Sequence, residues 1–161
     1  MELLDFNKSY TIDSLIGDIN ELQAKGIIAE NEKESLDIEG IFGFLDSSIF
    51  GRMQKSKDFE KEKAFNLMID SSVISDDYQG DNKILVQGII DLYFKEDDKC
   101  ILIDYKTDYV EKDNITEKLD EYKKQLLLYK MALENIKKIK VPEAYLYFSK
   151  VREFVKIDFG G

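Results

Sequence analysis

The apolar positions in the first third of the chain recur at the spacing of an α-helix. Five of them follow Thr11 and fall on one helical face, at 0, 3, 4, 7 and 10 positions from the first: Ile12, Leu15, Ile16, Ile19 and Leu22. This spacing predicts a helix that ends at Lys25-Gly26. Two further helices are predicted at about residues 31–38 and 41–51. We therefore interpret residues 1–57 as a helical N-terminal part.

The pattern changes to that of β-strands after Asp58. Residues 59–69 have an extended pattern, and a polar loop follows at 75–82. Residues 84–94 are β-rich and apolar on both faces, which is typical of a strand inside a sheet. Residues 95–99 have the composition of a hairpin turn, and 100–106 form the predicted returning strand.

The most regular helical pattern covers residues 117–136, after a polar connection. Its apolar residues step by three and four positions along one face: Leu119, Tyr122, Leu126, Tyr129, Leu133 and Ile136. We expect Val141-Pro142 to break the chain, and strands at 144–149 and 154–157 to follow. The element order predicts one α/β domain, with a mixed-sheet core in residues 58–161.

The composition removes several kinds of active site. The 161 residues include no histidine and one cysteine, and 33 acidic against 23 basic residues give a net charge of −10. These counts exclude a histidine-based triad, an intrachain disulfide and a cysteine-held zinc or iron–sulfur site within this chain. No apolar stretch is long enough for a membrane span and no leader is visible. Together with the lone Cys100, this predicts an intracellular compartment and no membrane partner.

Two acidic residues stand at what the pattern predicts to be the ends of neighbouring strands. Asp91 follows one strand and Asp104 the next, so a hairpin would bring their carboxylates side by side. Side chains alternate along a strand, so Lys106 shares the face of Asp104 while Tyr105 points away. Two buried carboxylates need a compensating charge, and Asp91, Asp104 and the Tyr105 carbonyl are oxygen ligands that suit magnesium. Lys106 would orient a water or neutralise charge on a phosphate.

Three motifs in this order resemble the PD-(D/E)XK nucleases of the RecB-like group. They are Gly88-Ile-Ile-Asp91, Asp104-Tyr-Lys106 and Gln125-Leu-Leu-Leu-Tyr129. The surrounding strings at 86–91 and 105–108 are most similar to the C-terminal nuclease domain of AddA-type helicase–nucleases. The resemblance implies a restriction-endonuclease-like fold: a central mixed sheet flanked by helices, after an N-terminal helical stretch.

The resemblance also assigns roles to individual residues. Asp91, Asp104 and Tyr105 would hold Mg²⁺, for which Mn²⁺ would substitute, and Lys106 would be the catalytic lysine. Gln125 and Tyr129 would face the site or the DNA, although Tyr129 also lies on the core stripe. One further residue, Glu62, matches a position weakly implicated at the site and fits an ordinary strand surface equally well.

The implied activity is metal-dependent exonuclease cleavage of the 3′-ended DNA strand during double-strand-break repair and recombination. The implied partners are the single strand produced by unwinding, helicase domains upstream in the same polypeptide and an AddB-type subunit, in the bacterial cytoplasm. The group usually has a metal-binding histidine ahead of a segment like residues 1–6. We therefore expect a C-terminal fragment of a longer helicase–nuclease that is weak or inactive alone. The alternatives are another RecB-like nuclease, or a catalytically incomplete module that guides DNA or docks a partner subunit.

Overall fold

One mixed five-stranded sheet organises the chain. The computed structural model describes residues 1–73, 82–108 and 115–159, so most of the predicted loop at 75–82 and of the connection after 107 lies outside the described residues. The strands, in the order in which they pair, are β1 (Phe59–Asp70), β2 (Lys83–Glu96), β3 (Lys99–Lys106), β4 (Lys140–Phe148) and β5 (Glu153–Lys156). β3 and β4 are parallel, and the other neighbours are antiparallel.

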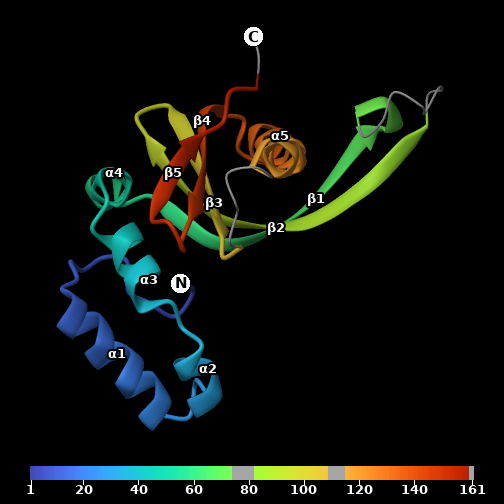
Figure 1. Cartoon of the computed structure of the whole chain (residues 1–161). Helices are drawn as coiled ribbons and strands as arrows, with labels where there is room; N and C mark the ends of the chain where they lie inside the picture. The colour runs from blue at the N-terminus through green and yellow to red at the C-terminus, as the bar shows by residue number, and fades with distance from the viewer. Residues whose placement is uncertain (74–81, 109–114, 160–161) are drawn as a thin grey trace.

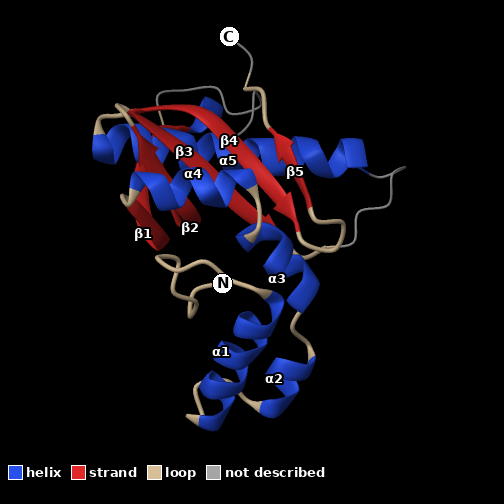
Figure 2. Cartoon of the chain, turned by 90° about the vertical axis from the view of Figure 1, so that its left-hand side faces the viewer, coloured by secondary structure: helices blue, strands red, loops and turns tan. Residues whose placement is uncertain are grey.

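Helices cover both faces of this sheet. They are α1 (Ile12–Ala24), α2 (Glu30–Glu34), α3 (Ile38–Leu45), α4 (Ser48–Ser56) and α5 (Ile115–Lys137), with a short 3₁₀ turn, η1 (Ser71–Val73), after β1. α5 packs on one face, and α3 and α4 lie on the other, with α1 and α2 beyond them (Figures 1 and 2). This arrangement confirms the predicted α/β class, with a mixed sheet flanked by helices and a helical N-terminal part.

Each face of the sheet has its own apolar core. Leu126 and Leu133 of α5 are buried against strand residues such as Leu102. The predicted stripe does not continue to the end of α5, because Ile136 is 46% exposed. On the other face, Phe44 of α3 is fully buried within the second core.

The predicted helix at 41–51 is wrong, because the structure has two helices there. α3 ends at Leu45, and α4 begins anew with Ser47 as its N-cap, whose hydroxyl accepts a hydrogen bond from Phe50 N at 3.1 Å. A serine that caps the first free backbone N–H groups stabilises a new helix start. The second helix then runs through Gly51 to Ser56.

Val141-Pro142 also differs from its predicted role as a break. Both residues belong to β4, which begins at Lys140. Pairing with β3 skips a residue there, from Lys99–Lys140 to Ile101–Glu143. This irregularity places Pro142, which has no N–H to donate, where the ladder is already interrupted.

The hairpin of β1 and β2 extends beyond the rest of the sheet as an arm (Figure 1). The two strands pair from Phe59–Phe94 to Asp70–Lys83, but β3 pairs with β2 only between Leu92 and Glu96. The sheet therefore divides beside Asp91. Within the described part of the chain, no helix is long and apolar enough to span a membrane.

Candidate active site

Asp91 and Asp104 meet at the point where the arm leaves the sheet. Leu92 pairs with Ile103, so the two acids take the next positions on β2 and β3. Asp104 is only 2% exposed, and the Asp91 Oδ2 atom accepts a hydrogen bond from the Tyr105 backbone N at 2.9 Å. The prediction that each strand ends at its acid is wrong, because β2 and β3 both continue further. The predicted closeness is nevertheless present.

The electrostatics of this pair reflect the loss of water. Burial raises the pKa of Asp104 to about 6; Lys106 opposes this shift and the neighbouring Asp91 carboxyl adds to it. Burial also raises the pKa of Asp91, against the hydrogen bond from Tyr105 N. Removing a carboxylate from water disfavours its charged form, and a second carboxylate disfavours it further. The pair is therefore held in a place where negative charge is poorly compensated.

Lys106 lies on the same face as Asp104, as strand alternation predicts. Its Nζ is 2.6 Å from Asp104 Oδ2 and donates a hydrogen bond to Gln125 Oε1 at 2.8 Å. The same ammonium lies 4.3 Å from the centre of the Tyr122 ring. Tyr105 points to the opposite core, where its ring meets Phe44 edge-on at 5.0 Å. Lys106 is thus held by a carboxylate, an amide and an aromatic ring.

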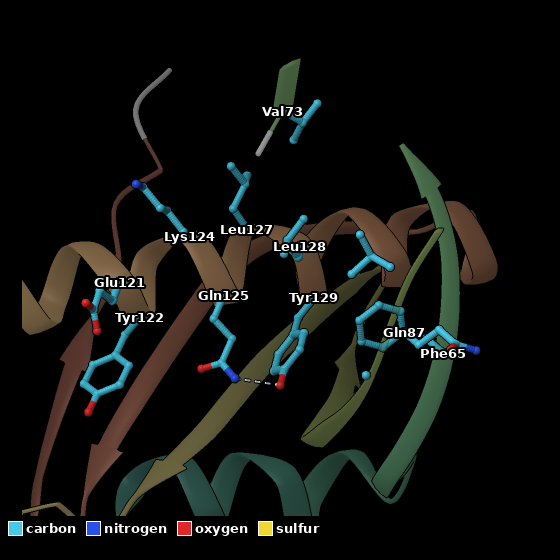
Figure 3. A pocket seen from close by; sticks show the side chains of 12 residues that line it. Phe65, Val73, Gln87, Glu121, Tyr122, Lys124, Gln125, Leu127, Leu128 and Tyr129 are labelled. Atoms are coloured by element: carbon cyan, nitrogen blue, oxygen red, sulfur yellow. Dashed lines mark hydrogen bonds between the residues drawn. The ribbon is translucent and has the colours of Figure 1, made fainter. Parts of the chain in front are cut away.

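Gln125 and Tyr129 reach this site from α5. Gln125 Nε2 donates a hydrogen bond to Tyr129 Oη at 2.9 Å, one helical turn away (Figure 3). Tyr129 is 9% exposed, and its ring packs edge-on against Phe65 at 5.6 Å. A continuous polar chain therefore runs from Asp104 through Lys106 and Gln125 to Tyr129, while the Tyr129 ring remains part of the core.

Glu62 lies near the pair but does not join it. It stands opposite Asp91, between the paired positions Lys61–Leu92 and Lys63–Ile90, with a φ of 50°. Partial burial and then the charge of Asp91 raise its pKa. The described residues contain no group of three histidine, cysteine or acidic side chains close enough to hold a metal ion. Glu62 is therefore a neighbour of the pair and not a third ligand in this arrangement.

This region is also shaped by three residues without a predicted site role: Tyr122, Gly88 and Phe65. Tyr122, besides its contact with Lys106, donates a hydrogen bond to Asp108 Oδ2 at 2.7 Å. A Cβ on Gly88 would lie 2.8 Å from Cε1 of Phe65, so this glycine allows the Phe65 ring to cross the backbone closely. Tyr122 stands three residues before Gln125, and that spacing on one helix face is the signal that could have revealed it.

Comparison with known proteins agrees with this geometry. The family model of the PD-(D/E)XK nuclease superfamily matches residues 30–157. The chain belongs to this superfamily. Proteins named as one subunit of an ATP-dependent helicase/nuclease are similar to nearly the whole chain. The protein from Clostridium acetobutylicum is 35% identical over 98% of the chain, that from Alkaliphilus oremlandii 38% over 98%, and that from Thermoanaerobacter sp. 37% over 91%.

This PD-(D/E)XK nuclease domain corresponds to a small part of those relatives. The chain covers 13% of the Clostridium and Alkaliphilus proteins and 12% of the Thermoanaerobacter protein. Homology to these helicase/nuclease proteins confirms the family that the three motifs indicated. It extends to the nuclease domain and not to the remaining length of those proteins.

The residues of this nuclease domain fit a divalent cation. Asp104 Oδ2 is buried, and within the described residues it has the ion pair with Lys106 Nζ but no hydrogen bond. Two neighbouring carboxylates that disfavour each other's charge are the hard oxygen donors that Mg²⁺ takes, commonly as one or two protein carboxylates plus waters. Within the described residues, Lys106 is the only basic side chain that forms an ion pair with Asp104.

Proposed function

We propose that the chain is the nuclease module of an AddA-type helicase–nuclease and that it hydrolyses DNA phosphodiester bonds with Mg²⁺, for which Mn²⁺ substitutes. The observation that carries this proposal is the convergence of the buried Asp104 with the partly buried Asp91 and Lys106 in one site. Its support from homology is the superfamily match and the helicase/nuclease relatives. The proposal thus assigns the nuclease activity to three side chains, Asp91, Asp104 and Lys106.

Asp91, Asp104 and the carbonyl of Tyr105 are the proposed cation ligands. When bound, the cation supplies polarisation of the scissile phosphate and a water of lowered pKa. Lys106 places a positive charge beside the two carboxylates, where negative charge on the phosphate develops. Its contacts with Gln125 Oε1 and the Tyr122 ring hold the ammonium in one position, so little reorganisation is needed during the reaction.

Gln125, Tyr129 and Glu62 have proposed roles around this centre. Gln125 orients Lys106 through its carbonyl and Tyr129 through its amide N–H group. Tyr129 presents its hydroxyl at the edge of the site while Phe65 fixes its ring. Glu62 contributes negative charge near Asp91, where its carboxylate adds to the attraction for a cation. Gln125 and Tyr129 therefore act by positioning other groups of the site, and Glu62 acts through its negative charge.

The proposed substrate is the single strand that a helicase delivers, cut as an exonuclease from the 3′-ended strand. The proposed partners are helicase domains upstream in the same polypeptide and an AddB-type subunit, in the bacterial cytoplasm, with a role in double-strand-break repair and recombination. The printed names of the relatives and the small share of their length that the chain covers support this setting. Residues 1–57 and 58–161 act as one unit in this proposal, because α3 and α4 pack on the sheet and α1 packs on α3.

The test is cleavage of an end-labelled single DNA strand with and without Mg²⁺ or Mn²⁺. We expect weak but cation-dependent cutting that falls at least about a hundredfold in Lys106→Met. Lys99→Met is the matched control, since Lys99 is an exposed lysine at the far end of the same strand. Labels on the 5′ and 3′ ends separately report the polarity. Cutting without a cation, or equal loss in both variants, would contradict the proposal.

A catalytically incomplete module that guides DNA is the second candidate. The observation in its favour is that the described residues offer two converging carboxylates and no third, with Lys106 already paired to one of them. This candidate predicts binding of the labelled strand with no cutting at any cation concentration. Another RecB-like nuclease predicts cutting as well, and differs only in whether helicase domains precede the chain in the gene.

A further inference from the structure

A groove of about 520 Å³ lies between α5 and the arm, next to the candidate active site. Its apolar lining includes Val73, Val86, Leu127 and Leu128. Figure 3 shows its polar part, where Gln125 and Tyr129 make their hydrogen bond. The volume falls within the roughly 300–1,000 Å³ of small-molecule pockets. The groove is therefore large enough for one flat organic group.

The groove is continuous with the site through shared residues. Gln125 lines it and also accepts the hydrogen bond from Lys106, which is paired with Asp104. Tyr129 and Phe65 line it with their edge-to-face rings. If a phosphate of the strand lies beside Lys106, the base of a neighbouring nucleotide can therefore reach the groove.

The charges of the groove also permit a polyanion to approach. The chain has a net charge of −10, but the described residues that line the groove include one carboxylate, Glu121, and one ammonium, Lys124. Lys124 is exposed on α5, where it can meet a phosphate. The lining is thus nearly neutral and mainly apolar, which suits an uncharged aromatic ring attached to a charged backbone.

We propose that this groove receives a nucleobase of the DNA strand, from a nucleotide next to the phosphate that is cut. This inference rests on the proposed nuclease function and adds a base-binding subsite to it. The apolar walls and aromatic rings would accept any base, because stacking and apolar contact use the face that all bases share. The contact would hold the strand in register while the phosphate lies at Asp91 and Asp104.

The test measures binding of two single strands of equal length and charge, without divalent cation. One is oligothymidylate, and the other is the same backbone with every base removed. Val86→Phe places a larger side chain in the apolar lining of the groove, and a phenylalanine suits a strand. Leu85→Phe is the matched control, since the neighbouring Leu85 is 56% exposed on the other face of β2. Circular dichroism and thermal unfolding check the fold of each variant.

We expect Val86→Phe to weaken binding of the thymidylate about tenfold and to leave binding of the abasic strand unchanged. Leu85→Phe should change neither. Equal effects of Val86→Phe on both strands, or no effect on either, would overturn the subsite, and would instead suit a groove covered by a protein segment. The unmodified chain gives a readout independent of any variant: equal affinity for both strands also overturns the subsite.

Failure of this inference is separable from failure of the nuclease proposal. Cation-dependent cutting without base-dependent binding removes the subsite and leaves the nuclease. Base-dependent binding that Val86→Phe abolishes, without cutting at any cation concentration, removes the nuclease and leaves a base-binding site in a DNA-guiding module.

Discussion

The buried charge of Asp104 gives a prediction about stability as well as activity. In the protein without a divalent cation, the ionised carboxylate is disfavoured by burial and by Asp91 beyond what Lys106 compensates. The change Asp104→Asn keeps the shape of the side chain and removes this charge. We therefore expect the variant to be more stable than the unmodified chain when no cation is present, although it should have lost its activity.

The magnitude follows from the pKa. It rises from 3.8 to about 6 in the folded chain. A shift of roughly two units corresponds to about 3 kcal/mol, an upper value that already includes the attraction of Lys106. Because the pKa is higher in the folded state than in the unfolded state, folding is not penalised at low pH. The free energy of unfolding falls as the pH rises from about 4 to 6, and the full penalty remains above that range.

Urea unfolding followed by tyrosine fluorescence is the assay, because the chain has nine tyrosines and no tryptophan. With EDTA at about pH 8, Asp104→Asn should raise the free energy of unfolding by about 2–3 kcal/mol, and at about pH 3 by close to zero. Adding Mg²⁺ should stabilise only the unmodified chain. The control is Asp98→Asn, which changes an exposed acid in the turn between β2 and β3. A variant that is less stable than the unmodified chain at high pH would refute the reasoning.

Three further changes test other parts of the structure by the same unfolding assay. Gly88→Ala places a Cβ 2.8 Å from the Phe65 ring and should cost about 1–3 kcal/mol; an unchanged stability would contradict the close approach. Glu60→Gln removes a carboxylate that bonds Lys137 and whose pKa is lowered to about 2. Its stabilisation is present above the unfolded pKa of 4.5 and is lost as the pH falls towards 2, so the variant should lose about 1 kcal/mol at neutral pH, after allowance for solvent screening, and nothing near pH 2. Ser47→Ala removes the N-cap of α4 and should cost about 1 kcal/mol at every pH.

The sequence by itself determined the features that depend on residues close together in the chain. Strand alternation alone places Lys106 on the face of Asp104 and turns Tyr105 away, and the contacts agree. Helical periodicity alone locates α5, and the motif spacing alone places Gln125 and Tyr129 one turn apart. Such patterns depend on backbone geometry that repeats over a few residues, so a single sequence carries them.

The tertiary structure decided whatever depends on residues far apart in the chain. The inclusion of Pro142 in β4 depended on pairing with β3 that local propensity does not contain. The hydrogen bond between Lys106 and Gln125 exists only because α5 crosses the sheet beside β3. The burial that raises the pKa of Asp104, and the groove beside it, likewise arise from several elements together. Solvent exclusion is a property of the assembled fold, because no short segment can remove water from its own side chains.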